Sequence, residues 1–296
     1  MKQFSKLLSA FLVLFILVGN SLSQGSSPID IAIDRDGVIL KGKFYVVEET
    51  GTYSTVILLH GFPGGEIDVL GIGSKLVQAG INVVTFNYSG THQSQGEFNF
   101  ENTQKDIWAV FQFIHKAESI QKYKIDTARI YIGGFSYGGG MALTFTANHL
   151  EVNNVFSIAG NDHGEFFREY ARNPELKKAI DDMFEELTYP SGPVRFAIGG
   201  TAKEIAEMKI IELNPTYDLR KSAPLLVDKN ILLLGGWEDV NVSIENILLP
   251  LYRALKKEKV ENVRFIVYHT THSFSNVRDK LAEDIIEWLK KDSNNN

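Results

Sequence analysis

The chain of 296 residues contains no cysteine. It therefore has no disulfide bond, no thiolate nucleophile, no thiolate metal ligand and no cysteine that could carry an N-terminal lipid. A chain of this length without cross-links depends on its hydrophobic core. Its 44% hydrophobic residues are enough for one large domain, or at most two small ones.

Long basic runs are also missing. The formal net charge is -6, and the densest basic stretch, Lys256 to Lys259, is short and contains Glu258. Because binding a nucleic-acid backbone requires many Lys and Arg side chains, we expect no nucleic-acid partner.

Patterns for metals and redox cofactors are absent from the sequence as well. There is no His-x-x-x-His, and Gly71-Ile72-Gly73 falls inside an expected helix rather than at the start of a dinucleotide-binding sheet. We therefore expect neither a metal nor a cofactor.

The first residues read as an export signal. Lys2 and Lys6 precede an apolar stretch over residues 7–18, and the small residues Ser21 and Ser23 follow it. We expect a signal peptide over 1–23, a mature domain over 24–296 and a periplasmic or secreted product. The apolar stretch is too short to span a bilayer comfortably, so no stable membrane insertion is expected after cleavage.

After this segment, strand-like and helix-like patterns alternate. Residues 29–34 and 38–47 read as an antiparallel pair around Asp36-Gly37, and continuous apolar runs then alternate with amphipathic stretches. This alternation of strands and helices predicts an α/β fold with a mostly parallel central sheet covered by helices on both faces. The later expected strands are 55–59, 81–86, 129–132, 154–159, 231–234 and 263–268, and the expected helices are 67–79, 104–116, 141–149, 242–257 and 277–289.

The alternation stops between residues 161 and 224. This stretch is polar, irregular and interrupted by prolines, with one helical patch over 174–187. It shows no repeated apolar face of its own, which favours a lid inserted into the sheet over a separate domain. Its large apolar side chains either line a pocket or pack the lid against the sheet. They are Phe166, Phe167, Tyr170, Met183, Phe184 and Tyr189.

The sequence Gly-Phe-Ser-Tyr-Gly-Gly-Gly, residues 134–140, follows the apolar run 129–132. A strand, Gly-x-Ser-x-Gly and a helix in this order are typical of a nucleophile elbow, in which glycines permit a tight turn that exposes the serine. We expect Ser136 to be a catalytic nucleophile.

A serine nucleophile needs a base, and the base needs an acid to orient it. The acid candidate is Asp239, in the loop after the strand 231–234, ahead of Glu238, Asp162 and Asp218. The base candidate is His272, between the last strand and the last helix. The six other histidines are expected to have bracing, surface or packing roles.

The oxyanion of a tetrahedral intermediate needs two backbone donors. One is expected from Tyr137, directly after the nucleophile. The other is expected from Phe62 in the loop His60-Gly61-Phe62-Pro63, since Pro63 has no N–H.

These motifs together resemble the α/β-hydrolase superfamily of serine hydrolases, in order from about residue 55 to residue 289. The elbow is similar to that of prolyl oligopeptidase (S9) catalytic domains, and the stretch from Asn87-Tyr88-Ser89-Gly90 to Gly96-Glu97 resembles bacterial serine esterases, including cinnamoyl esterases. The resemblance implies an α/β-hydrolase fold and the triad Ser136, Asp239 and His272. Two features depart from S9 peptidases: His60-Gly61-Phe62-Pro63 replaces their His-Gly-Gly-Pro, and about thirty residues before the core leave no room for their propeller.

The expected reaction is hydrolysis of small-molecule carboxylic esters through an acyl-enzyme. The alternative is cleavage of short peptides, as an aminopeptidase or acyl-peptide hydrolase, in which Glu165 or Glu169 would hold the substrate amine. A non-catalytic binding protein on the same fold is the third hypothesis. The sequence gives no indication of an oligomeric state.

Overall fold

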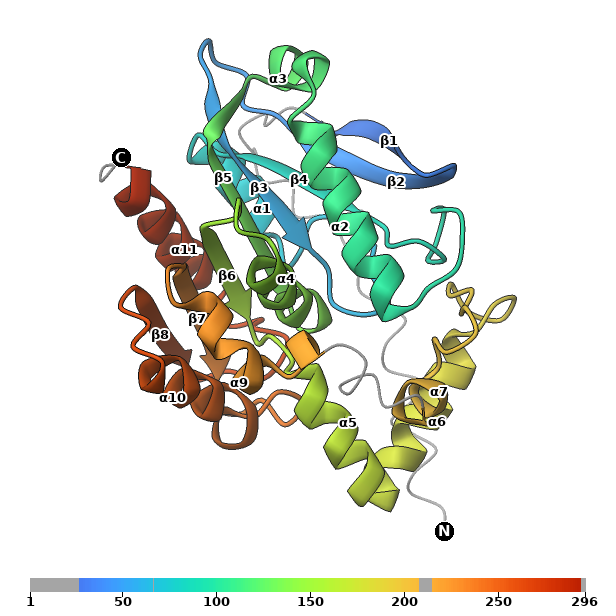
Figure 1. Ribbon diagram of the computed structural model, residues 1–296. Coiled ribbons are helices and arrows are strands. Elements are labelled where there is room, and N and C mark those ends of the chain that lie inside the picture. Colours follow the sequence, from blue (N-terminus) through green and yellow to red (C-terminus); the bar gives the residue numbers. More distant parts are fainter. Residues whose placement is uncertain (1–26, 66, 208–214, 294–296) are drawn as a thin grey trace.

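The computed structural model describes residues 27–65, 67–207 and 215–293 (Figure 1). The expected signal peptide lies outside these residues. Within them, no helix combines the length and the apolar character needed to cross a bilayer.

In this part of the chain eight strands form one sheet, in the order β1-β2-β4-β3-β5-β6-β7-β8. Strand β2 pairs antiparallel with β1 and with β4, and every other pair of neighbours is parallel. The expected mostly parallel sheet is therefore confirmed. The strands are β1 (Ile29–Arg35), β2 (Val38–Tyr45), β3 (Tyr53–Leu59), β4 (Asn82–Phe86), β5 (Ile125–Phe135), β6 (Asn154–Ile158), β7 (Asn230–Gly236) and β8 (Val263–Tyr268).

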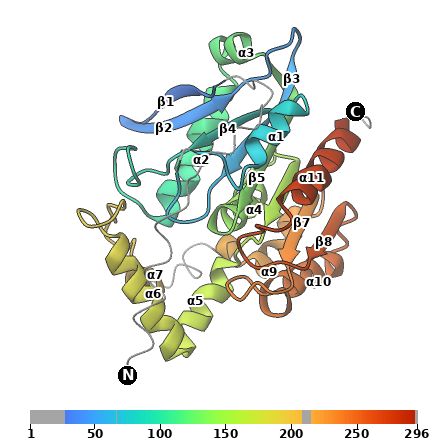
Figure 2. The ribbon, with the colours of Figure 1, turned by 180° about the vertical axis from the view of Figure 1, so that it is seen from behind.

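Helices cover both faces of the sheet. Figure 1 looks onto the face covered by α2, α4, α9 and α10, and Figure 2 shows α1 and α11 on the opposite face. The helices are α1 (Ile72–Gln78), α2 (Phe100–Ile114), α3 (Ala117–Tyr123), α4 (Tyr137–Asn148), α5 (His163–Arg172), α6 (Pro174–Leu187), α7 (Ala202–Glu207), α9 (Leu219–Ser222), α10 (Leu249–Lys257) and α11 (Arg278–Ser293), with short turns at Pro215–Tyr217, Ala223–Leu226 and Ile244–Leu248.

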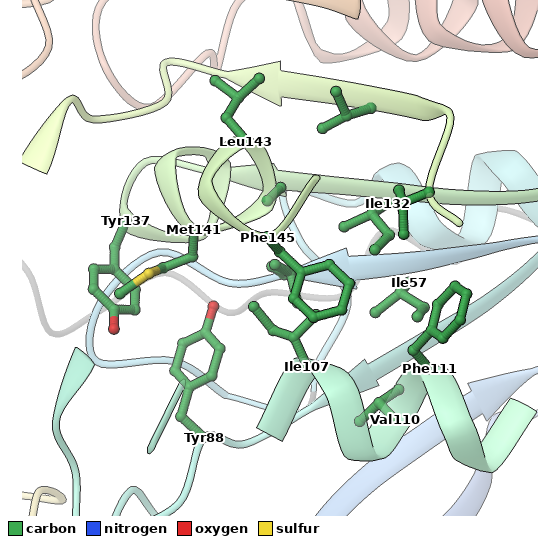
Figure 3. Packing of buried hydrophobic residues seen from close by; sticks show 14 of the residues in the cluster. Ile57, Tyr88, Ile107, Val110, Phe111, Ile132, Tyr137, Met141, Leu143 and Phe145 are labelled. Carbon is green, nitrogen blue, oxygen red and sulfur yellow. The ribbon is translucent and has the colours of Figure 1, made fainter. Parts of the chain in front are cut away.

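The core is split by the sheet into two apolar layers. In one layer, Ile107 and Val110 of α2 and Phe145 of α4 pack together with Ile57 and Ile132 of the central strands, all fully buried (Figure 3). The other layer lies under α1 and α11. Helix α4 is buried along nearly its whole length, so the turn that precedes it has little freedom to move.

Three helices begin four or five residues away from the expected start. Helix α2 begins at Phe100 rather than at 104, because the Asn99 side chain caps it by accepting a hydrogen bond from the N–H of Asn102 at 2.6 Å. Helix α4 begins at Tyr137 rather than at 141. Its glycines, residues 138–140, lie where neighbouring backbone is too close for a Cβ, and they do not delay the start of the helix. Helix α1 begins at Ile72 rather than at 67, with the Asp68 carboxylate accepting from the N–H of Gly73 at 2.6 Å.

The helix expected over 242–257 is divided in two. A π-helical turn, Ile244–Leu248, precedes α10, and the N–H of Leu248 donates to the Ser243 carbonyl at 3.3 Å. Pro250 lies in the first turn of α10, where its missing N–H is tolerated.

The insertion, residues 161–224, lies between β6 and β7. The expected helical patch is confirmed as α6, but the polar stretch before it, expected to be irregular, forms α5, capped by Asp162 through the N–H of Glu165 at 3.2 Å. Helices α5, α6 and α7 lie together beyond the end of the sheet, at the bottom of Figure 1.

Candidate active site

Ser136 stands between β5 and α4 with a φ of +54°. A positive φ is strained for a residue with a Cβ, and the strain is maintained by tight packing on both sides. A Cβ on Gly134 would lie 2.4 Å from the carbonyl oxygen of Gly138, and one on Gly138 would lie 2.4 Å from that of His60. The elbow therefore requires glycine at both positions.

The next two glycines bring a second loop close to the elbow. A Cβ on Gly140 would lie 2.1 Å from the carbonyl oxygen of Asn161, and one on Gly139 would lie 2.8 Å from the Cα of Gly160. In this arrangement the N–H of Asn161 donates to the Ser136 carbonyl at 3.1 Å. Gly139 and Gly140, which are poor helix formers in the sequence, therefore lie inside α4 and allow the β6–α5 loop to pack against this helix.

Ser136, His272 and Asp239 form a continuous hydrogen-bonded array. Nε2 of His272 lies 3.0 Å from Oγ of Ser136, and Nδ1 of His272 lies 2.7 Å from Oδ2 of Asp239. Because a carboxylate only accepts, Nδ1 carries the proton and Nε2 of the neutral ring accepts from the serine hydroxyl. The structure thus brings together the three residues that the sequence proposed.

The Asp239 carboxylate is fully buried. Its second oxygen accepts hydrogen bonds from the N–H groups of Asn241 and Val242, both at 2.9 Å, which fix the carboxylate in the loop after β7. The His272 side chain keeps 22% of its surface exposed and packs against the Phe135 ring, with centroids 4.8 Å apart.

The rival acids lie elsewhere. The Glu238 side chain is half-exposed and faces His269, 3.5 Å away. Asp162 caps α5 and pairs with Arg220, and Asp218 caps α9 and pairs with Arg168.

The other histidines have bracing and packing contacts. They are His60, buried at the end of β3; His92, bonded to the Gly64 carbonyl; His115, bonded to the Phe111 carbonyl; His149, stacked on Phe145; His163, packed on Phe100; and the exposed His269.

The two expected backbone donors flank Ser136. Tyr137 is the first residue of α4, so its N–H has no acceptor within the helix. Phe62 belongs to the 60–65 loop, which passes so close that a Cβ on Gly61 would lie 3.4 Å from the Ser136 Cβ. The rings of Phe62 and Tyr137 are 5.9 Å apart.

Ser136 and His272 open into a cavity of about 880 Å³. Many of its lining side chains are aromatic or aliphatic and come from residues 62–100 and from the insertion; they are called the apolar wall here. The apolar wall contains Phe62, Phe98, Phe100, Phe166, Phe167, Leu176, Ile180, Met183 and Phe184. The segment that follows Asp239 contributes both polar and apolar lining residues within 240–250.

Of the six large side chains singled out in the insertion, Phe166, Phe167, Met183 and Phe184 line this cavity. The other two do not. The Tyr170 hydroxyl bonds to Asp181 of α6, and Tyr189 is 60% exposed.

The two acids considered for binding a substrate amine, Glu165 and Glu169, both line the cavity but differ in their pairing. The Glu165 carboxylate is bonded to Arg168 and to Arg220. Partial burial opposes ionisation of Glu165, but its hydrogen bonds and ion pairs with the two arginines keep its pKa below the usual value. Glu169 is exposed, and its carboxylate accepts a long hydrogen bond from the side-chain amide of Asn173 at 3.5 Å.

Several lining residues had no signal in the sequence. His163, which the sequence placed among the packing histidines, lies in the cavity wall, where its ring packs on Phe100 and Tyr137 at centroid distances of 4.9 and 5.2 Å. Burial lowers its pKa to about 3, so the ring is neutral near pH 7. Asn161 and Arg220 also reach the cavity, and only the tertiary fold brings them there.

The chain is similar to known proteins with the same fold. Residues 54–196 match the family model described as the alpha/beta hydrolase fold. The chain is 18% identical to a proline iminopeptidase of Thermoplasma volcanium, over 80% of this chain and 88% of that protein. It is 24% identical to a cutinase of Thermobifida cellulosilytica, over 75% of this chain and 74% of that protein.

Among solved structures, an esterase of Pyrococcus furiosus superposes with a TM-score of 0.63 at 20% identity, covering 90% of this chain and 91% of the esterase. Proteins named as esterases and peptidases are thus both among its relatives. The sheet order, the match of residues 54–196 and this structural similarity show that the chain has the α/β-hydrolase fold.

Proposed function

We propose that the protein is a serine hydrolase of carboxylic esters, with Ser136 as nucleophile, His272 as base and Asp239 as the acid that orients it. The observation that carries the proposal is the array in which His272 lies 3.0 Å from the Ser136 hydroxyl and 2.7 Å from the Asp239 carboxylate. This array opens into the cavity from a strained elbow, where an acyl group can reach it.

In the proposed reaction, Oγ of Ser136 attacks the acyl carbon while Nε2 of His272 takes the hydroxyl proton. The buried Asp239 carboxylate stabilises the imidazolium that forms. The N–H groups of Phe62 and Tyr137 stabilise the oxyanion. The C–O bond then breaks, His272 returns the proton to the leaving alcohol, and water releases the acid by the same steps.

The pairing of Glu165 favours esters over peptides with a free amine. A carboxylate that holds an amine must be uncompensated, whereas Glu165 is already bonded to two arginines. Glu169 also lines the cavity, but it is exposed, where water screens its charge. A peptidase with the same triad is the second candidate, because the proline iminopeptidase is similar over most of its length.

We also propose that the insertion forms part of the acyl pocket and acts as a lid over it. The contribution of Phe166, Phe167, Met183 and Phe184 to the cavity wall supports a large apolar acyl group.

The test of the chemistry is labelling with a fluorophosphonate, beside Ser136→Ala, followed by assays of p-nitrophenyl esters and aminoacyl amides. We expect Ser136 alone to be labelled and esters to be turned over. Labelling that persists in Ser136→Ala would refute the nucleophile, and turnover of amides without esters would favour the peptidase.

We also propose, from the sequence of residues 1–23, that the protein is exported and that this segment is removed. The full chain expressed in a host with a general export pathway should appear outside the cytoplasm and begin at Gln24. N-terminal sequencing of the exported product decides this, and a product that stays in the cytoplasm with Lys2 and Lys6 intact would contradict it.

A further inference from the structure

The 60–65 loop, which follows β3, contains the proposed donor Phe62. Two side chains of one other segment bond to carbonyls at its two ends. The Tyr88 hydroxyl donates to the carbonyl of His60 at 2.6 Å, and Nε2 of His92 lies 3.0 Å from the carbonyl of Gly64. Since a carbonyl only accepts, Nε2 of His92 carries a proton here.

Tyr88 is fully buried and positioned by aromatic contacts. Its ring packs edge-on against Tyr137, the residue of the second proposed donor, with centroids 5.5 Å apart, and Figure 3 shows the two side chains beside each other. A Cβ on Gly64 would lie 3.3 Å from the Tyr88 ring, so the loop rests directly on it. One tyrosine therefore contacts both segments that carry the proposed oxyanion donors.

The 87–98 loop that carries Tyr88 and His92 is itself anchored. Both the N–H and the hydroxyl of Ser89 donate to the buried Asp106 carboxylate of α2, at 2.7 and 2.6 Å. The other oxygen of Asp106 lies 2.7 Å from the guanidinium of Arg35 at the end of β1.

The insertion provides a second anchor for this loop. The N–H of Arg195 donates to the Gly90 carbonyl at 2.7 Å, and the N–H of Phe98 donates to the Arg195 carbonyl at 2.7 Å. The guanidinium of Arg195 also bonds to the carbonyls of His92, Ser94 and Gly96. One arginine of the insertion thus fixes the turn that contains His92.

We infer that Tyr88 and His92 are positioning residues for the oxyanion donor of Phe62, and that Arg195 links the insertion to that donor through the 87–98 loop. The inference rests on the proposed function. Its physical basis is that an oxyanion donor acts only when it is held in place before the reaction, so loosening the loop slows the chemical step more than it weakens substrate binding.

The first experiment compares Tyr88→Phe with Tyr131→Phe. Both tyrosines are buried and donate to a backbone carbonyl, but Tyr131 bonds to Leu289 on the far side of the sheet, at 3.3 Å. We expect Tyr88→Phe to lower kcat on a p-nitrophenyl ester about 10-fold or more with little change in KM, and to weaken a boronic-acid transition-state analogue by the same factor. Tyr131→Phe should retain kcat.

The second experiment tests the hydrogen bond from Nε2 of His92 to the Gly64 carbonyl. His92→Leu should lower kcat, and His92→Gln, which retains an N–H donor, should restore much of it. Arg195→Gln should lower kcat several-fold although Arg195 does not line the cavity.

Hydrogen–deuterium exchange provides a readout that does not depend on catalysis. Peptides covering residues 58–65 should exchange faster in Tyr88→Phe than in the wild type or in Tyr131→Phe. Unchanged exchange and unchanged kcat in Tyr88→Phe, in a protein whose Ser136 is still labelled by a fluorophosphonate, would overturn this inference and leave the proposed function intact. Fluorophosphonate labelling and ester turnover that persist in Ser136→Ala would overturn both the inference and the proposed function.

Discussion

The Asp239 carboxylate is fully buried and joined to Nδ1 of His272 at 2.7 Å, although 33 residues separate the two in the chain. The adjacent Glu238 points instead to the exposed His269. Two neighbouring acids in one loop therefore face different histidines, and only Asp239 is shielded from water beside the candidate nucleophile.

The first prediction concerns these two acids. Asp239→Asn should lower kcat/KM about 10³- to 10⁴-fold, because an amide no longer stabilises the imidazolium and permits the wrong tautomer. Glu238→Gln should change kcat/KM less than about 3-fold, since exposed pairs contribute little. Steady-state assays on one p-nitrophenyl ester decide between them, and the opposite order would assign the acid role to Glu238.

The second prediction concerns Gly140. Gly140→Ala should destabilise the protein by about 3 kcal/mol and lower kcat, because the added Cβ would displace the Asn161 backbone. Gly71→Ala is the control: it has a φ of +75° but nothing within 4 Å of the added Cβ, so a loss of about 1 kcal/mol is expected. Urea unfolding measures both. Equal losses would show that the contact with the β6–α5 loop is unimportant.

The third prediction concerns acid stability. Burial holds the pKa of His163 at about 3, against a usual 6.5. Below pH 6.5 the unfolded chain binds a proton that the folded chain does not, so the stability present above pH 6.5 is lost as the pH falls toward 3. From pH 7.5 to 4.5 this amounts to about 3 kcal/mol.

His163→Leu removes the group that produces this loss. The difference in unfolding free energy between wild type and His163→Leu should therefore shift by about 3 kcal/mol between pH 7.5 and 4.5, in favour of the variant at the lower pH. Urea titrations at both pH values measure the shift. His269→Leu, at an exposed histidine, is the control, and the same shift in both variants would exclude burial as its cause.

The fourth prediction concerns the apolar wall of the cavity. Met183→Ala and Ile180→Ala should each lower kcat/KM for a long-chain ester relative to a short-chain ester by about 10-fold, since each removes two or three methylene-sized contacts. Ala179→Ser, on the exposed side of α6, should leave the ratio unchanged. A ratio that is also unchanged in both cavity variants would place the acyl group elsewhere.

The residues that the sequence could predict are those whose position follows from local pattern and strand order. Ser136, Asp239 and His272 each follow a strand of the parallel part of the sheet, and the carboxyl ends of parallel strands lie at one edge of the sheet. The direction of every strand from β3 onward was therefore enough to bring them together.

The rest of the site depends on tertiary contacts that have no sequence period. His163 lies in a helix whose residues are mostly polar, and its place in the cavity wall is fixed by packing on Phe100 and Tyr137. Arg195 lies about a hundred residues from the carbonyls that it binds. Neither contact leaves a local pattern, because each depends on how the insertion folds back onto the sheet.

The positive φ of Ser136 has a consequence for how the protein can be stabilised. A left-handed backbone suits glycine and costs a serine about 1 kcal/mol. Ser136→Gly should therefore unfold at a higher temperature than Ser136→Ala, while neither has a hydroxyl to attack a substrate. Selection for stability alone would replace the nucleophile, so the elbow is a position where activity is maintained against the preference of the backbone.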